Sequence, residues 1–263
     1  MGHRPRKRWG QHFLHDRHAV DRIIRAVAPT AADHILEIGP GEGVLTQPLL
    51  AAAGRVDVIE IDRDLAAGLE QLEDVDGRLQ VHPTDALTFD PATIAGDAPL
   101  RVVGNLPYNI STPLLFHLLA HRRYLRDMHL MLQREVVERM AAPAGAPGRG
   151  RLSVMLQAFC RVESLFRLPP GVFRPPPRVD SAVVRLLPLD EPAVDTAAGD
   201  PFAEIVRTAF GARRKTLRRS LAPLLDAETI AACDVAPELR PERLEIEQFA
   251  ALARALAEHR RGR

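Results

Sequence analysis

The alternation of apolar and polar positions divides most of the chain into short helical and extended segments. Val20, Ile23, Ile24 and Val27 recur at helical spacing and predict an amphipathic helix over residues 18–27. Compact apolar runs bounded by glycine, asparagine or acidic residues predict buried strands. We expect strands at residues 34–39, 56–62, 78–86, 100–105, 129–133 and 180–189, and further helices at 44–54, 64–72 and 152–160.

This alternation indicates an α/β protein with a Rossmann-like parallel sheet and helices on both faces. Two segments interrupt it. The first, 141–150, is rich in glycine and proline and predicts a mobile connection, whereas 168–181 holds five prolines around Phe173 and suits neither a helix nor a central strand. We predict a larger domain over 1–190, with a basic arm at 1–15, and a small all-helical C-terminal domain over 200–263.

Composition and charge are those of an ordinary globular protein. Of 263 residues, 46% are hydrophobic and 26% charged, and the net charge is only +1, so a surface that binds a polyanion must be local. Cys160 and Cys233 are too few for a disulfide framework and lack zinc-site spacing, so we expect no metal. No apolar run suits a secretory signal or a membrane span. We expect a cytoplasmic monomer; a transit peptide is the alternative for the basic N-terminus.

A glycine loop lies where the strand at 34–39 meets a helix. Gly39, Gly41 and Gly43 give the spacing G-x-G-x-G, which differs from the dinucleotide fingerprint because position 44 is Val. The glycines let backbone amides approach a ligand closely, and the N-terminus of the next helix is partially positive. By itself the loop suits a dinucleotide, a nucleotide or a methyl donor; a tight turn without a ligand is the alternative.

Two acidic residues narrow the choice of ligand. Glu60, near the end of the second strand, can accept hydrogen bonds from both hydroxyls of a ribose, and strand register favours it over Asp62 and Asp64. Asp85 follows the third strand and can accept from the exocyclic amine of adenine; its alternative role is a helix N-cap. Together these features indicate an adenosine-containing cofactor. Because no arginine-rich pyrophosphate pocket is evident, S-adenosylmethionine is favoured over NAD.

The loop after the fourth strand carries the candidate catalytic residues Asn105, Leu106, Pro107 and Tyr108. If the methyl acceptor is adenine N6, its lone pair is delocalised into the ring and is a poor nucleophile. Hydrogen bonds from the amine to the Asn105 side-chain carbonyl, and to the backbone carbonyl of Leu106 or Pro107, would turn that lone pair towards the methyl group. Tyr108 can stack on the base. An amide is no general base, so the proton leaves after transfer, to water. The alternative is a type I turn with a buried ring.

This loop resembles that of the ribosomal RNA adenine N6-dimethyltransferases. Segments similar to that family's motifs continue in the same order over nearly the whole chain, at 7–16, 37–46, 105–119, 132–140, 150–159, 172–186 and 209–221. The resemblance implies a class I methyltransferase sheet. It is closest to the bacterial small-subunit enzymes, which dimethylate two adjacent adenosines in a 3′-terminal hairpin loop of small-subunit ribosomal RNA during subunit biogenesis.

The resemblance also implies residue roles. It places Tyr108 against the target base, with Phe173 closing the other side. Many family members have Asn where this chain has His12, and several have Tyr where it has Arg149, whose role stays open. The implied contacts with S-adenosylmethionine are His12, Leu14, Gly39, Gly41, Glu60, Asp85 and Asn105.

Basic residues concentrate in the N-terminal arm and in segment 212–219. On a helix, the basic residues of this segment fall largely on one face, while Leu217 and Leu221 can face the core. Phosphate contact is favoured over a merely solvated surface, and such contacts position RNA without reading its sequence. The predicted RNA-binding residues are Arg6, Lys7, Arg8, Arg213, Arg214, Lys215, Arg218 and Arg219.

Two other functions stay open at the level of sequence. A relative that methylates large-subunit ribosomal RNA and confers macrolide resistance would share the fold, but the long match through 172–186 and 209–221 argues against it. A non-enzymatic factor, such as a mitochondrial transcription factor or an assembly chaperone, would not need the intact glycine loop, Glu60 and the 105–108 loop. A checkpoint role in subunit assembly can coexist with catalysis.

Overall fold

The computed structural model describes residues 11–72, 77–192, 194, 201–212 and 214–261. The chain divides into two compact units. The first contains residues up to Val137 together with Glu163–Pro188, and the second contains Glu138–Val162 and the residues from Leu189 onward. The domain boundary between 190 and 200 stays a prediction, and the internal segment Glu138–Val162 groups with the C-terminal helices. No helix in the described ranges has the length and apolar character that a membrane crossing requires.

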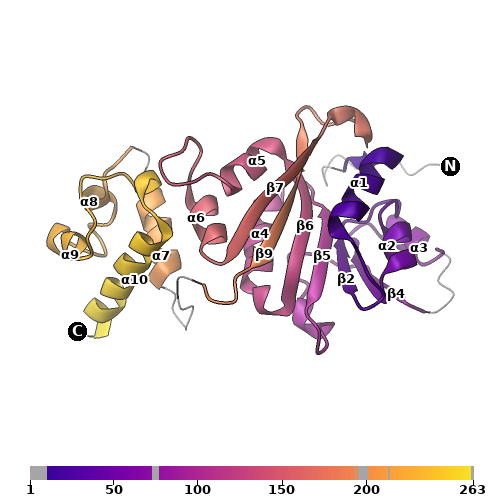
Figure 1. The fold of residues 1–263 in the computed structure, drawn as a ribbon, viewed down its shortest axis with the longest axis horizontal. Coiled ribbons are helices and arrows are strands. Elements are labelled where there is room, and N and C mark those ends of the chain that lie inside the picture. The colour runs from indigo at the N-terminus through magenta and orange to yellow at the C-terminus, as the bar shows by residue number, and fades with distance from the viewer. Residues whose placement is uncertain (1–10, 73–76, 193, 195–200, 213, 262–263) are drawn as a thin grey trace. The chain divides into compact units, whose positions relative to one another are not determined.

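A seven-stranded sheet organises the first unit, in the order β4-β3-β2-β5-β6-β9-β7 (Figure 1). Five neighbouring strands are parallel, as the sequence predicts: β2 (His34–Ile38), β3 (Arg55–Ile59), β4 (Leu79–His82), β5 (Leu100–Asn105) and β6 (Leu125–Gln133).

The last part of the sheet differs from the expected parallel arrangement. The late strand β9 (Ser181–Pro188) is antiparallel to β6, and β7 (Cys160–Leu168) lies beside it at the edge. The sequence predicted the first of these strands but not the second, and it placed Cys160 in a helix. An edge strand is largely open to solvent, and only Cys160 and Leu168 of β7 are buried. Because most of its positions are not buried, β7 lacks the run of apolar residues that predicts a strand.

The helices of the first unit cover both faces of the sheet. Connections between neighbouring parallel strands are as a rule right-handed. The step from β2 to β3 runs towards one edge and the step from β5 to β6 towards the other, so the connecting helices α2 and α4 lie on opposite faces. The bounds are α1 (Arg17–Val27), α2 (Thr46–Ala52), α3 (Arg63–Leu69) and α4 (Ser111–Ala120), with 3-10 turns η2 (Pro91–Thr93) and η3 (Arg122–Tyr124). On the first face, buried residues of α1, α2 and α3 pack with Val58 and Val103.

A separate two-stranded sheet joins the N-terminal segment to the proline-rich segment. β1 (Phe13–Leu14) pairs with β8 (Phe173–Arg174), which follows the 3-10 turn η4 (Pro170–Val172). Leu14 and Phe173 are opposite one another, and both are buried. The expectation that 168–181 forms neither helix nor central strand is confirmed, because its short strand lies outside the main sheet.

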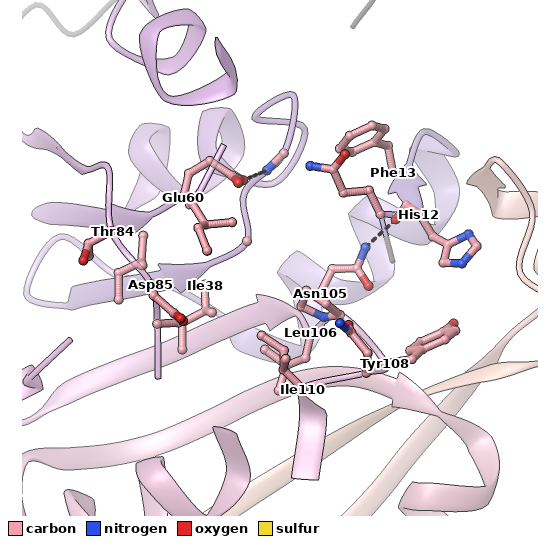
Figure 2. Close-up of a pocket in the computed structure, with 18 residues that line it drawn as sticks. His12, Phe13, Ile38, Glu60, Thr84, Asp85, Asn105, Leu106, Tyr108 and Ile110 are labelled. Atoms are coloured by element: carbon pink, nitrogen blue, oxygen red, sulfur yellow. Dashed lines mark hydrogen bonds between the residues drawn. The ribbon is translucent and has the colours of Figure 1, made fainter. Parts of the chain in front are cut away.

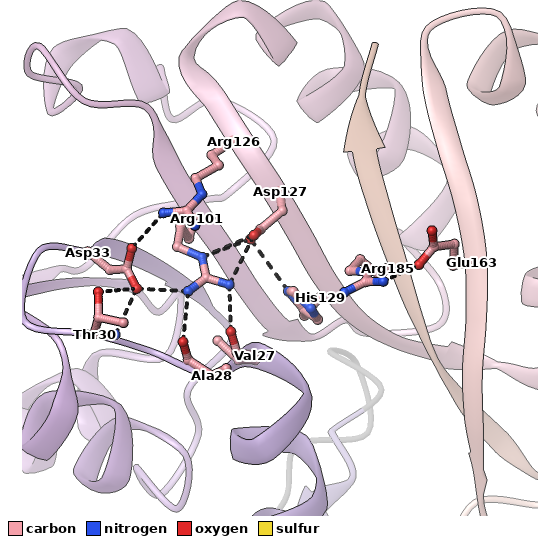
Figure 3. A network of polar contacts seen from close by, with 10 residues as sticks. All are labelled: Val27, Ala28, Thr30, Asp33, Arg101, Arg126, Asp127, His129, Glu163 and Arg185. Carbon is pink, nitrogen blue, oxygen red and sulfur yellow. Dashed lines mark hydrogen bonds and ion pairs between the residues drawn. The ribbon is translucent and has the colours of Figure 1, made fainter.

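A buried ion cluster ties α1 to the amino ends of β5 and β6 (Figure 3). Arg101 lies between the carboxylates of Asp33 and Asp127, at 2.8 and 3.0 Å. It also donates to the carbonyls of Val27 and Ala28, the last residue of α1 and its C-cap. One guanidinium therefore pairs with two buried acids and satisfies carbonyls at the end of a helix.

The second unit is helical from residue 201, as predicted. Its elements are α6 (Arg151–Gln157), α7 (Pro201–Phe210), α8 (Leu217–Ser220), α9 (Ala227–Ala232), η5 (Pro241–Arg243) and α10 (Ile246–Arg261); α5 (Arg134–Met140) crosses the division between the units. Phe159 and Phe202 form an edge-on pair, with ring centroids 6.0 Å apart, and Phe210 stacks on Phe249 at the same separation. These aromatic pairs join α7 to its neighbours in the core.

The glycine- and proline-rich loop at 141–150, which the sequence predicts to be mobile, is anchored by several hydrogen bonds in the structure. Arg149 is 6% exposed, and it donates to the Ala142 carbonyl, to Gln157 Oε1 and to the Leu244 carbonyl. The Gly145 amide donates to the Glu242 carbonyl at 2.7 Å. Burial lowers the pKa of Arg149. Its role in this structure is to cross-link backbone carbonyls that are far apart in the sequence.

Candidate active site

A cavity of about 280 Å³ opens at the carboxyl ends of β2, β3 and β5 (Figure 2). The order of the strands reverses between β2 and β5, the position at which doubly wound sheets bind their ligands. Its apolar wall includes Ile38, Ile59, Ile61 and Ile110. The part of the chain that the structure describes contains no group of three or more His, Cys, Asp or Glu side chains arranged to hold a metal ion.

The glycine loop has the backbone that its sequence demands. Gly39, Gly41 and Gly43 have φ angles of 67°, 59° and 79°, in the left-handed region. A Cβ atom on Gly41 would lie 2.8 Å from the ring of Phe13, so a larger residue would also displace the N-terminal segment. Both Gly39 and Gly41 line the cavity, as their predicted role requires.

Glu60 lies directly after β3 and is 5% exposed. Its carboxylate accepts hydrogen bonds from the Gly41 amide at 3.2 Å and from the Asp62 amide at 2.9 Å. Burial raises the pKa of Glu60, while these two hydrogen bonds act in the opposite direction. Glu60 thus links the glycine loop to the end of β3 and places an acidic group in the cavity wall.

The other acidic residues considered for ligand contact differ in whether they line the cavity. Asp62 is fully buried and caps α3 by accepting from the Asp64 amide, and neither residue lines the cavity. Asp85 does line it, next to Thr84. One oxygen of Asp85 accepts from the Leu87 amide at 2.9 Å, so a local turn role is present together with the position predicted for ligand contact.

The amide of Asn105 is held in one orientation. Its Nδ2 donates to the backbone carbonyl of His12 at 2.8 Å (Figure 2). Since a carbonyl can only accept, the NH₂ group must face His12, and Oδ1 is the acceptor that remains for another partner. The N-terminal segment therefore selects the orientation in which Asn105 can accept a hydrogen bond within the cavity.

A turn does follow Asn105, but it begins two residues later. The Pro107 carbonyl accepts from the Ile110 amide at 3.1 Å, and the Leu106 amide donates to the Met131 carbonyl of β6. Leu106 is 1% exposed. The turn that was the alternative interpretation of this loop is therefore present. The side chain of Asn105 lies outside this turn.

Tyr108 is fixed at both its hydroxyl and its ring. Its hydroxyl lies 2.6 Å from Ser181 Oγ at the start of β9. Its ring centroid is 5.5 Å from that of His12, whose Nδ1 donates to the Pro175 carbonyl at 2.7 Å. Burial raises the pKa of Tyr108, so the phenol is neutral at physiological pH. A half-buried aromatic ring is thereby presented at the cavity and held by contacts with Ser181 and His12.

Two predicted residues lie elsewhere. Phe173 is 2% exposed and belongs to the hydrophobic core, so it does not close the cavity opposite Tyr108 in this structure. The physical reason is its pairing with β1, which turns this apolar ring inward. Leu14 is buried for the same reason, and it borders only a small hollow beside the glycine loop.

Sequence reasoning missed Glu37, which faces that same small hollow from β2. Glu37 is 1% exposed and accepts from Thr46 Oγ1 at 2.7 Å. Burial raises its pKa to about 7; the Thr46 hydrogen bond opposes this, and the charge of Glu60 adds to it. Its position two residues before Gly39, on an otherwise apolar strand, was the signal that could have identified it.

The basic segment of the second unit is exposed but is not one helix. α8 contains only residues 217–220, and Arg214 has a φ of 64°, which no α-helix contains. The prediction of one continuous helical face was therefore wrong, although Leu217 and Leu221 are buried as expected. Arg214, Lys215, Arg218 and Arg219 are all exposed. Arg6, Lys7, Arg8 and Arg213 lie outside the described residues.

The fold and site together define a class I methyltransferase. A family model described as "Ribosomal RNA adenine dimethylase" matches residues 2–258, and the chain belongs to that family. "Ribosomal RNA small subunit methyltransferase A" of Pseudomonas aeruginosa is 52% identical over 257 residues, covering 97% of this chain and 96% of the relative. The protein of the same name from Xanthomonas euvesicatoria is 52% identical over 248 residues, covering 94% and 95%.

Two solved structures share this fold at 28% identity. A dimethyladenosine transferase from Plasmodium falciparum superposes with a TM-score of 0.82 over 95% of this chain and 98% of its own. The 23S rRNA methyltransferase ErmE superposes with a TM-score of 0.73 over 93% and 99%. Because a 23S rRNA methyltransferase shares this fold, the fold alone does not identify which RNA is the target.

Replacing Glu60 tests the predicted ribose contact. Glu60→Gln keeps the shape of the side chain but places an NH₂ donor where the carboxylate now accepts from Gly41 or Asp62. We expect the Kd for S-adenosylhomocysteine, measured by calorimetry, to rise about 10- to 100-fold, the value of one hydrogen bond to a charged group. Asp64→Asn, a matched change at an exposed position, should leave the Kd unchanged. An unaltered Kd for Glu60→Gln would show that Glu60 does not contact the methyl donor.

Proposed function

We propose that this protein transfers methyl groups from S-adenosylmethionine to N6 of two adjacent adenosines in the 3′-terminal hairpin loop of small-subunit ribosomal RNA. The products are dimethyladenosines, formed during subunit biogenesis. The observation that carries the proposal is the fixed amide of Asn105, whose oxygen is the only end left to accept from an amine in the cavity. The names of relatives 52% identical over nearly their whole length support the small-subunit target over the large-subunit one.

The cavity fits an adenosine-containing methyl donor. The left-handed glycines leave room beside Gly39 and Gly41, Glu60 offers a buried carboxylate for ribose hydroxyls, and Asp85 lines the wall further along. The isoleucines of the wall offer apolar contact for the faces of a base. Bound S-adenosylmethionine would supply an electrophilic methyl group; every other part of the reaction depends on how the chain positions the acceptor.

The proposed mechanism relies on positioning rather than on acid–base catalysis. In the first transfer, Asn105 Oδ1 and the Leu106 or Pro107 carbonyl accept hydrogen bonds from the two N–H groups of the adenine amine, which directs its lone pair out of conjugation with the ring. In the second transfer, one acceptor holds the single N–H group that remains. Tyr108 holds the base flat by stacking. Asn105 cannot take up a proton and the Tyr108 phenol is neutral, so neither acts as a base. After transfer the cationic amine is acidic enough to lose its proton to water.

The basic segment around α8 is proposed to bind the RNA backbone. Reversing two exposed charges there, with Arg214→Glu and Arg218→Glu, should weaken binding of unmodified small subunits at least about tenfold and leave binding of S-adenosylhomocysteine intact. Arg218 has one weak ion pair, with Glu238 at 3.9 Å, so little folding stability is lost. RNA affinity that is unchanged at moderate salt contradicts this role.

A single experiment tests the proposed function as a whole. The protein is incubated with radiolabelled S-adenosylmethionine and small subunits that lack the modification, with large subunits as the parallel substrate. We expect incorporation only into the small subunit, as two methyl groups on each of two neighbouring adenines. Incorporation into the large subunit would indicate the macrolide-resistance activity, and no incorporation into either would indicate a non-enzymatic factor.

A further inference from the structure

The proline-rich segment before β9 carries two cationic side chains that the proposed mechanism does not use. Arg174 and Arg178 are exposed, and Val179 between them and β9 is 46% exposed. The nearest acidic residue in the sequence, Asp180, is paired with Arg134 at 3.6 Å. Within the described ranges neither Arg174 nor Arg178 takes part in an ion pair. Their charge is therefore available to an external anion.

This segment is attached directly to the wall of the cavity. At one end, Arg174 is opposite Phe13 in the β1–β8 pair, and the Pro175 carbonyl accepts from His12. At the other end, Ser181 lies within hydrogen-bonding distance of Tyr108. His12, Phe13 and Tyr108 all line the cavity. The two arginines therefore belong to a backbone whose ends are fixed next to residues that line the cavity.

The intervening backbone is stiff. Pro175, Pro176 and Pro177 occupy three of the four positions from 175 to 178, and Pro177 is buried, which anchors the middle of the segment. Proline restricts the backbone of these residues, so less conformational entropy is lost when the segment binds a partner. Two guanidinium groups carried on a restricted backbone suit phosphate groups, which they bind through paired, charge-assisted hydrogen bonds.

We propose that Arg174 and Arg178 bind the phosphates of the RNA strand on either side of the adenosine that enters the cavity. This inference rests on the proposed function. A base can reach the cavity only after it leaves its stack, and its own backbone then passes over the cavity rim. Contacts to that backbone hold the nucleotide in position and carry no sequence information.

Charge reversal of both residues tests the proposal. For Arg174→Glu/Arg178→Glu we expect the KM for unmodified small subunits, and the Kd for the isolated hairpin RNA, to rise at least tenfold, with kcat within threefold of wild type. The dependence of log Kd on log salt should become shallower by about 0.7 for each single-strand phosphate contact that is lost. The Kd for S-adenosylhomocysteine should not change. Arg174→Lys/Arg178→Lys should keep most of the RNA affinity.

A matched control uses two exposed arginines at the opposite end of the sheet. Arg25 lies in the last turn of α1, and Arg123 lies in η3 just before β6. Arg25→Glu/Arg123→Glu changes the net charge by the same amount and should leave the KM and the RNA Kd at wild-type values. If the control variant lost the same RNA affinity, the effect would be explained by net charge alone and the proposal would be overturned.

Three other outcomes also overturn it. They are an unchanged RNA Kd in the glutamate variant, a parallel loss of binding to S-adenosylhomocysteine, and a loss seen only with complete subunits but not with hairpin RNA. The last would place the partner of the two arginines elsewhere on the subunit. If the wild-type protein binds the hairpin but transfers no methyl group, the proposed function fails, while the binding comparison still decides the role of the two arginines.

Discussion

Asn105→Ala is expected to remove nearly all methyl transfer while the protein stays folded. The change deletes the only side-chain acceptor that the His12 carbonyl orients towards the cavity. Loss of one pre-positioned polar group that acts on the transition state lowers kcat by about 10²–10³-fold. The measurement is single-turnover transfer of labelled methyl to unmodified small subunits. Calorimetry with S-adenosylhomocysteine and thermal unfolding serve as the folding controls.

Asn105→Asp separates the two functions of this amide. The carboxylate keeps an acceptor for the amine but can no longer donate to the His12 carbonyl, and its negative charge faces that carbonyl. We expect a rate between those of the wild type and Asn105→Ala. A fully active Asn105→Ala enzyme would reduce this loop to a structural turn and refute the mechanism.

Arg101→Met is expected to lower the free energy of unfolding by about 3–5 kcal/mol, because two buried carboxylates lose the buried cation that they share. The side chains of Arg101, Asp33 and Asp127 are 6%, 3% and 8% exposed (Figure 3). The change also removes donors from the Val27 and Ala28 carbonyls at the end of α1. Denaturant unfolding at neutral pH measures the difference.

The matched control is Arg126→Met. Arg126 pairs with the same Asp33 at 2.9 Å, but its side chain is 60% exposed, so the loss should be below about 1 kcal/mol. If the two variants lost the same free energy of unfolding, burial of Arg101 would not explain how the cluster stabilises the protein.

The loss of stability caused by Arg101→Met should depend on pH. Burial raises the pKa of both carboxyls, but hydrogen bonds from Thr30 and Arg101 to Asp33 outweigh it, as do the His129 ring 3.5 Å from Asp127 and the hydrogen bonds from Arg101 to Asp127, and each pKa stays below its usual value. Groups with depressed folded-state pKa values stabilise the protein above the unfolded-state pKa and lose that contribution as pH falls through the folded-state pKa. The stability gap between wild type and Arg101→Met should therefore be widest near neutral pH and narrow below about pH 4.

Local pattern was sufficient wherever a feature depends on one strand and the turn that follows it. The strands from β2 to β6, the glycine loop and the order of Gly39, Glu60, Asp85 and Asn105 follow from apolar runs that end at polar or glycine residues. Because the carboxyl ends of parallel strands meet at one edge of a sheet, these residues come together once the alternation is recognised.

Local pattern failed where a distant segment decides the conformation. The basic periodicity of 212–219 predicts a longer helix than α8, but the Leu217 amide donates to the Leu239 carbonyl and the Arg218 amide to the Pro237 carbonyl, which fixes the start of the helix at Leu217. Arg149 is held partly by the Leu244 carbonyl, 95 positions away in the sequence. No window of neighbouring residues contains such partners.

The sequence by itself determined the class of fold, the family motifs and which residue types reach the cavity, because these depend on short-range periodicity and on the chemistry of side chains. Only the tertiary structure decided which end of the Asn105 amide faces the cavity, that Tyr108 is held by Ser181, and that Phe173 is buried. The partners of Asn105 and Tyr108 lie 93 and 73 positions away. Hydrogen-bond direction is set by the partner, and the partner is known only when the chain has folded.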